Sequence, residues 1–273
     1  MPIVLSIAGF DPSAGAGVLA DIKTFAAHGV YGMACVTALT VQSTQGVRGV
    51  EPAAPRVVRE TLECLAQDVR FAAVKVGMLG SLAVAEEVLR WLRSQPGLPV
   101  ILDPILRASS GASLLEGKAV ALLRSGWLAR ANWVTPNLGE SAALAACPVP
   151  TSPAETESCA ARLQAQAAEA GNAGLGVVLT GGHAARPDDY LAWPGGCEWL
   201  PGERVETTAT HGTGCTFSSA FTAQLALGAE PREAAQRAKH YVTEALRAAV
   251  PIGRGTGPLQ HFWSAVPFRE PSV

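Results

Sequence analysis

A glycine-rich segment, Thr210-His211-Gly212-Thr213-Gly214-Cys215, stands immediately before a helical pattern that begins near Phe217. Glycines remove side-chain bulk, so successive backbone N–H groups can point at one oxyanion, and the dipole of the following helix adds positive potential there. A thiol in the first turn of such a helix is expected to have a lowered pKa. The segment therefore predicts an anion-binding loop with an acidified thiol, and the alternative is a glycine-rich loop with a buried cysteine.

Polar or small residues also follow each of six short apolar runs. These residues are Gly9-Phe10-Asp11, Gln42-Ser43-Thr44, Gly77-Met78, Asp103-Pro104-Ile105, Thr135-Pro136-Asn137 with Glu140 three residues on, and Thr180-Gly181-Gly182-His183. Ligands of open α/β sheets bind beyond the carboxyl ends of the strands. An isolated polar residue at a strand end is usually a turn former, but six in succession indicate a cleft.

The elements that must position these residues alternate along the chain. Nearly continuous apolar runs predict buried strands at Ile3–Ala8, Ala34–Val41, Ala73–Val76, Val100–Leu102, Trp133–Val134 and Leu175–Leu179. Helical periodicity predicts helices over 55–69, 81–94, 153–170 and about 230–249, and Pro194-Gly195-Gly196 predicts a small antiparallel hairpin near a sheet edge. Regular alternation predicts an α/β fold, a parallel sheet with helices on both faces, and one domain over residues 1–273.

A second glycine-rich turn, Gly15-Ala16-Gly17, invites a dinucleotide-binding interpretation. The G-x-G-x-x-G fingerprint would need a glycine where Ala20 stands, and no acidic residue ends a second strand about 20 residues later. A tight loop before a helix is the better interpretation, which disfavours a dehydrogenase.

Composition excludes several classes of protein. The 273 residues carry a net charge of −2, which argues against a polybasic nucleic-acid or membrane surface, and no apolar run approaches the roughly 20 residues of a membrane span. The six cysteines form no CxxC pair, and the N-terminus has no secretory signal pattern, so free thiols in a reducing cytoplasm are expected.

Taken together, the motifs resemble those of the hydroxymethylpyrimidine/phosphomethylpyrimidine kinases of thiamine biosynthesis. The resemblance is carried by residues 8–25, Val41–Thr44, Lys75–Leu79, Leu102–Pro104, Thr135–Glu140, Gly181–His183, Thr210–Cys215 and the tail Gly255–Trp263. It implies a ribokinase-like fold, a three-layer α/β/α sandwich around a mostly parallel sheet.

The resemblance also implies ATP-dependent phosphorylation of the hydroxymethylpyrimidine and of its monophosphate, with ATP and Mg²⁺ as cofactors and a homodimer as assembly. It places Gly9, Asp21, Gln42, Met78, Ile105 and Cys215 in the pyrimidine pocket, Asn137, Glu140, Thr180 and Lys239 on the ATP side, and Glu140 with Asp103 near the metal. Backbone amides of Gly212, Thr213 and Gly214 would hold the transferring phosphoryl group, and Cys215 would accept the hydroxyl proton.

The chain departs from the family pattern at several positions. Leu19 replaces a glutamine, Ser43 an asparagine, Ser109-Ser110-Gly111-Ala112 a Lys-Ser-Gly-Asp element, and Thr180 a lysine expected to reach the ATP phosphates. Lys239 or Arg107 could supply the missing cation. Two other functions stay open: a pyridoxine or pyridoxal kinase, which Gln42 disfavours, and a non-catalytic pyrimidine-binding sensor.

Overall fold

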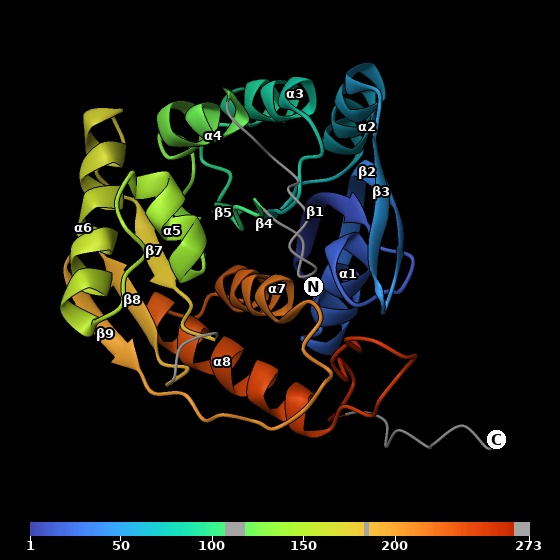
Figure 1. The fold of residues 1–273 in the computed structure, drawn as a ribbon. Helices are drawn as coiled ribbons and strands as arrows, with labels where there is room; N and C mark the ends of the chain where they lie inside the picture. The colour runs from blue at the N-terminus through green and yellow to red at the C-terminus, as the bar shows by residue number, and fades with distance from the viewer. Residues whose placement is uncertain (107–117, 183–185, 265–273) are drawn as a thin grey trace.

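The protein is described by a computed structural model for residues 1–106, 118–182 and 186–264. Its centre is a nine-stranded sheet with the order β3-β2-β1-β4-β5-β6-β7-β8-β9 (Figure 1). The strands are β1 Ile3–Phe10, β2 Tyr31–Ser43, β3 Gly46–Pro52, β4 Ala73–Val76, β5 Val100–Leu102, β6 Trp133–Val134, β7 Gly176–Leu179, β8 Asp189–Trp193 and β9 Gly196–Leu200.

The middle of the sheet is parallel. Strand β1 pairs in parallel with β2 and β4, and the parallel pairing continues through β5, β6 and β7. The outer strands β3, β8 and β9 pair antiparallel with their neighbours. Six parallel strands therefore end at one edge of the sheet, which is where ligands bind in open α/β sheets.

Helices cover both faces of this sheet (Figure 1). Their bounds are α1 Gly17–Ala27, α2 Pro55–Asp68, α3 Leu82–Arg93, α4 Lys118–Leu122, the π-helical turn η1 Leu123–Trp127, α5 Leu138–Ala145, α6 Pro153–Glu169, α7 Thr213–Ala226 and α8 Pro231–Arg247. Alternate residues of each buried strand point to opposite faces, so Leu5 and Ile7 join one hydrophobic core while Val4 joins the other.

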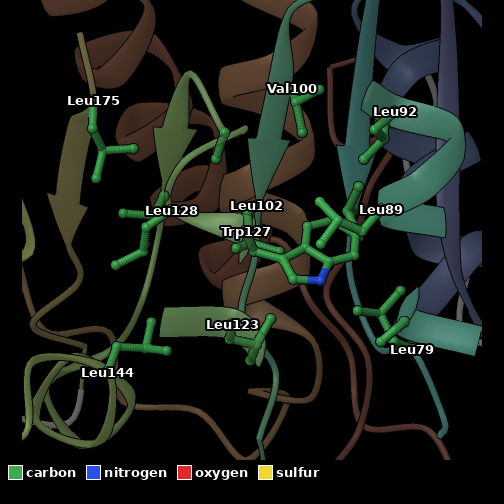
Figure 2. Close-up of a cluster of buried hydrophobic side chains, with 14 of the residues drawn as sticks. Leu79, Leu89, Leu92, Val100, Leu102, Leu123, Trp127, Leu128, Leu144 and Leu175 are labelled. Atoms are coloured by element: carbon green, nitrogen blue, oxygen red, sulfur yellow. The ribbon is translucent and has the colours of Figure 1, made fainter. Parts of the chain in front are cut away.

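The two cores belong to different sets of helices. One core packs α2, α3, η1, α5 and α6 against the sheet, and Figure 2 shows Trp127 of η1 lying among leucines of neighbouring elements. The other core packs α1, α7 and α8 against the opposite face. This is the predicted three-layer α/β/α architecture, and it is confirmed.

The predicted strands are all present, with one element that sequence reasoning missed. Strand β2 runs on to Ser43 and pairs with β3, which had not been predicted. Residues 46–52 include Gly46, Gly49 and Pro52 and are all at least partly exposed, so they show neither an apolar run nor a clean alternation. The predicted hairpin around Pro194 is β8–β9, and β9 forms the sheet edge.

None of the helices within the described ranges has the length and apolar character that a membrane crossing requires.

Candidate active site

The glycine-rich loop lies at the N-terminus of α7, the position from which anion binding is predicted. Gly212 caps the helix in the left-handed region, with φ +83°, and a Cβ there would lie 1.8 Å from the Gly15 carbonyl oxygen. Both conditions require glycine. A Cβ on Gly214 would meet nothing within 4 Å among the described residues, so there is open space beside the first turn. The first backbone N–H groups of α7 have no partner within the helix and are available to an anion in that space.

Cys215 occupies the first turn of α7 and is buried. The prediction of an acidified thiol is wrong for the protein without ligand, because burial raises the pKa of Cys215 to about 12. The ammonium of Lys75 and a hydrogen bond from the Gly17 N–H lower the pKa, but burial and the charges of Asp103 and Asp21 outweigh them. The helix N-terminus alone does not make this thiol a thiolate.

A fully buried ion pair lies beneath the loop. The Nζ atom of Lys75, in β4, is 3.0 Å and 3.2 Å from the two carboxylate oxygens of Asp21, in α1. The hydroxyls of Ser6 and Ser219 donate to the same carboxylate over 2.6 Å and 2.7 Å. Asp21 has no exposed surface. Its predicted contact with a substrate ring stays a prediction, and the contacts present give it a supporting role below the site.

Lys75 is a residue that sequence reasoning did not assign to the site. Its signal was a single lysine inside the apolar run Ala73–Val76, where a charge must find a partner in the core. Besides Asp21 it contacts Asp103, with 3.5 Å between Nζ and Oδ2. Its side chain thus links α1 and β4 to the end of β5. Burial alone would lower the pKa of Lys75, but the negative charges of Asp21 and Asp103 outweigh burial and raise this pKa above its ordinary value.

Two carboxylates, Asp103 and Glu140, lie at the ends of β5 and β6. Asn137 and Glu140 form a reciprocal capping box at the start of α5, with both hydrogen bonds at 2.9 Å. Burial and the charge of Asp103 raise the pKa of Glu140 to about 8, and burial likewise raises the pKa of Asp103.

This pair of carboxylates is chemically suited to a divalent cation. No group of three or more potential metal ligands occurs in the described part of the chain. Mg²⁺, however, is usually held by one or two carboxylates together with substrate phosphates. Asp103 Oδ2 is buried without a hydrogen-bond partner among the described residues, but it is ion-paired with Lys75 Nζ over 3.5 Å. A cation bound there would share this oxygen with the Lys75 ammonium.

Four of the predicted ring-binding residues lie at the ends of β1, β2, β4 and β5. A Cβ on Gly9 would be 2.2 Å from the Met78 methyl carbon, so the glycine makes room for the Met78 side chain. The Ile105 methyl group lies 3.6 Å from the Cβ position of Gly77. Gln42 contacts His211, with 3.0 Å between its amide nitrogen and Nε2. The structure thus gathers Gly9, Gln42, Met78 and Ile105 with the His211–Cys215 loop around one strand-end region.

Comparison with known proteins agrees with this geometry. The family model for phosphomethylpyrimidine kinase matches residues 11–260. The chain belongs to the phosphomethylpyrimidine kinase family. It is 37% identical over 263 residues to the hydroxymethylpyrimidine/phosphomethylpyrimidine kinase of Staphylococcus aureus strain MRSA252, covering 95% of this chain and 93% of that protein. The family resemblance and the phosphotransferase class inferred from the sequence are thereby confirmed.

The chain is similar to solved structures of two kinds of kinase, which are named for different substrates. A phosphomethylpyrimidine kinase from Clostridium difficile 630 matches with a TM-score of 0.78 and 31% identity, over 90% of this chain and 99% of that one. The ADP complex of Bacillus subtilis pyridoxal kinase matches with a TM-score of 0.85 and 31% identity, over 96% and 97%. The ribokinase-like fold is confirmed by these neighbours.

The ATP-side residues of the kinase are brought together only in part. Thr180 follows β7 and forms a bridge with Asn137 at the next strand end, so it lies beside the Asn137–Glu140 capping box. Lys239 lies in α8, and its Nζ is 2.7 Å from both Asp189 Oδ2 and the Pro187 carbonyl oxygen. Asp189 also accepts from the Gly181 N–H, so Lys239 lies close to the loop that follows Thr180. The charge of Lys239 is, however, neutralised by the Asp189 carboxylate.

Several residues named in the sequence analysis lie outside the described residues. These are Arg107, considered as a substitute cation, the departing segment Ser109-Ser110-Gly111-Ala112, and His183 of the matching Gly-Gly-His element. The compensating role considered for Arg107 therefore stays a prediction. Among the described residues, Lys239 is held by its own carboxylate, and Thr180 leaves no cation at its own position.

Proposed function

We propose that this kinase transfers the γ-phosphoryl group of ATP to the hydroxymethylpyrimidine of thiamine biosynthesis, and a second phosphoryl group to the resulting monophosphate. The observation that carries the proposal is the placement of the α7 N-terminus, with its open amide loop, over the buried Asp21–Lys75–Asp103 cluster. An amide end that attracts phosphate thus faces carboxylates that attract a metal ion. In-line phosphoryl transfer needs these two kinds of group to hold charge and geometry.

The backbone amides of Thr213, Gly214 and Cys215 bind the phosphoryl oxygens. Asp103 and Glu140 hold Mg²⁺, and the bound ion supplies positive charge that offsets the developing charge on phosphate oxygens. The Glu140 carboxylate accepts from the backbone N–H of Asn137 and from that of Leu106, and these bonds fix its orientation at the start of α5. Thr180 lies next to this pair on the nucleotide side.

Cys215 is the proposed proton acceptor for the substrate hydroxyl. Its raised pKa means that the thiol is protonated in the protein without ligand. The ammonium of Lys75 lowers the pKa of this thiol. Positive charge brought by a bound metal–nucleotide complex would lower it further. For this step Sγ must first become a thiolate, with the thiol proton released to solvent. Sγ then accepts the hydroxyl proton as the hydroxyl oxygen bonds to the γ-phosphorus and the bond from that phosphorus to the bridging oxygen breaks, which releases ADP.

A pyridoxal kinase is the second candidate, because the chain matches a solved pyridoxal kinase over nearly its whole length. Phosphate transfer from ATP should be measured to three acceptors: the hydroxymethylpyrimidine, its monophosphate and pyridoxal. The assay should be run with and without Mg²⁺, with Cys215→Ala as control and products identified by mass. We expect Mg²⁺-dependent formation of the pyrimidine diphosphate. Transfer to pyridoxal alone would replace the proposal with the second candidate, and transfer to none of the three acceptors would overturn both.

The assembly and location follow from family membership rather than from contacts. We infer a homodimer acting in the cytoplasm, with a small-molecule pyrimidine and ATP as its ligands and no nucleic acid or membrane partner. The near-neutral net charge of −2 supports the latter part of this inference. Sedimentation at assay concentration tests the dimer.

A further inference from the structure

His211 connects the loop after β1 to the side chain that is proposed to bind the substrate ring. Its Nε2 atom lies 2.7 Å from Asp11 Oδ2 and 3.0 Å from the amide nitrogen placed at the end of Gln42. The imidazole is 7% exposed, and a Cβ on Gly15 would be only 2.3 Å from its Cδ2 atom. The ring is therefore held by packing as well as by hydrogen bonds.

The Asp11 carboxylate is itself fixed. Oδ1 accepts from the backbone N–H and the hydroxyl of Ser13, at 2.8 Å and 2.7 Å, and Oδ2 accepts from the Ala16 N–H at 2.9 Å. These bonds and the one from His211 outweigh the effect of burial and lower the pKa of Asp11 to about 2. Asp11 is thus ionised at neutral pH and accepts only, so the facing Nε2 atom of His211 must carry a hydrogen.

A protonated Nε2 determines the orientation of the Gln42 amide. A protonated Nε2 has no lone pair with which to accept from the amide nitrogen, so the amide oxygen must lie toward His211. The one Nε2 hydrogen is then shared between Asp11 Oδ2 and the Gln42 oxygen. The oxygen and nitrogen of a glutamine amide have nearly the same shape, and their positions follow from the hydrogen-bond network. The exchange also suits Thr40, whose Oγ1 lies 3.2 Å from the other end of the amide and 3.0 Å from the Phe10 carbonyl oxygen. Thr40 then donates to Phe10 and accepts from the Gln42 amide.

We propose that His211, anchored by Asp11, is a positioning residue that fixes the Gln42 amide with its oxygen toward Nε2 and its nitrogen toward Thr40. In this orientation the amide has one N–H and one oxygen lone pair left for a ligand. Those two groups match a ring edge on which a nitrogen acceptor adjoins an exocyclic amine. A pyridine ring with no amine on that edge cannot satisfy the amide oxygen. This inference rests on the proposed function, because it explains how the site would favour a pyrimidine.

The test is a double-mutant cycle on the affinity of the hydroxymethylpyrimidine, measured by calorimetry in the full-length protein. His211→Phe removes the donor and keeps an aromatic ring of similar size. We expect it to weaken pyrimidine binding about 5- to 15-fold in the wild-type background, the range for one lost hydrogen bond. In a Gln42→Ala background the same change should alter affinity less than about twofold, because no amide remains to be oriented. Equal effects in both backgrounds would overturn the inference.

A second variant avoids the phosphate loop, since His211 directly precedes Gly212. Thr40→Val removes the partner of the amide nitrogen with little change of shape, and it should lower pyrimidine affinity about 3- to 10-fold while the KM for ATP is unchanged. His240→Phe, an exposed histidine of α8 that packs against Trp263, is the matched control and should leave both constants unchanged. A loss of ATP affinity in Thr40→Val equal to the loss for pyrimidine would indicate a general structural effect and refute the positioning role.

A readout without ligand separates this inference from the proposed function. The ¹⁵N–¹H signals of the Gln42 side-chain amide can be assigned by their absence in Gln42→Ala. Both His211→Phe and Thr40→Val should shift them, and His240→Phe should not. If the wild type fails to bind the pyrimidine, the proposed function fails, and these shifts still decide whether His211 orients Gln42. Unchanged signals in His211→Phe would overturn the positioning role alone.

Discussion

Replacement of Asp11 by asparagine tests the charge network at the start of the chain. The carboxylate accepts four hydrogen bonds, from His211, from Ser13 twice and from Ala16. Asparagine keeps a similar shape and one carbonyl acceptor, but it carries no charge. The stability that depends on ionised Asp11 should therefore be lost in Asp11→Asn, and its size is set by the difference in pKa between the folded and unfolded states.

The sign and size follow from the lowered pKa. Asp11 is shifted from the ordinary value of 3.8 to about 2 in the folded protein. Because each pKa unit corresponds to about 1.36 kcal/mol, the ionised carboxylate contributes about 2.4 kcal/mol at pH 7. A lowered pKa makes this contribution complete well above pH 3.8, so about 2 kcal/mol remains at pH 4 and about 1.3 kcal/mol at pH 3, and it disappears as the pH falls through 2.

The measurement is the free energy of unfolding in urea for wild type and Asp11→Asn at pH 7, 4 and 3. The difference between the two proteins should shrink by about 1 kcal/mol between pH 7 and pH 3, on top of any constant offset from the altered hydrogen bonds. Asp68→Asn, at an exposed position at the end of α2, is the control and should show a difference near zero throughout. A difference between wild type and Asp11→Asn that is independent of pH would refute the reasoning.

Three further predictions concern the catalytic end of the sheet. Cys215→Ala should cut turnover by about two to three orders of magnitude and leave the nucleotide Kd nearly unchanged by calorimetry; wild-type turnover would make Cys215 a packed thiol only. Thr180→Lys should raise kcat/KM for ATP about tenfold by adding a charge-assisted hydrogen bond, since Lys239 is held by Asp189; an unchanged value would mean that another cation already fills this place. Lys75→Met should lower the free energy of unfolding in urea by about 3–5 kcal/mol, because it leaves the carboxylates of Asp21 and Asp103 buried without their cation. A loss below about 1 kcal/mol would contradict this.

Most of the fold follows from the sequence because buried parallel strands leave a strong signal. The runs Ala73–Val76 and Val100–Leu102 are almost wholly apolar and buried on both faces. Strand β3 gave no such signal, since it pairs on one side only and carries two glycines and a proline. Its pairing with β2 depends on the tertiary position of the hairpin, which a local pattern does not encode.

Candidate site residues could be predicted from the sequence where they lie at the ends of strands. They could not be predicted where they lie inside a strand or make contacts between distant parts of the chain. Gln42, Asp103 and Asn137 follow apolar runs, so topology alone brings them to one edge. Lys75 lies inside a strand, and His211 contacts Asp11 across 200 positions of sequence. The pKa of Cys215 could not be predicted either, because the depth at which the helix end is buried is set by packing of α7 against α1, α8 and β4.

The charges of the site fall into two regions that suit the two ends of a metal–nucleotide complex. Among the described residues, the carboxylates of Asp21 and Asp103 lie against one ammonium, that of Lys75, and Glu140 lies near Asp103 with its pKa raised to about 8. This surplus of negative charge is one reason why the pKa values of Glu140 and Cys215 are raised together with that of Asp103. A free phosphate would be repelled there, whereas a cation would be stabilised. The α7 amides have the opposite preference. A ligand that presents a cation to one region and phosphate oxygens to the other satisfies both, which favours Mg²⁺-bound ATP over free ATP as the species that binds.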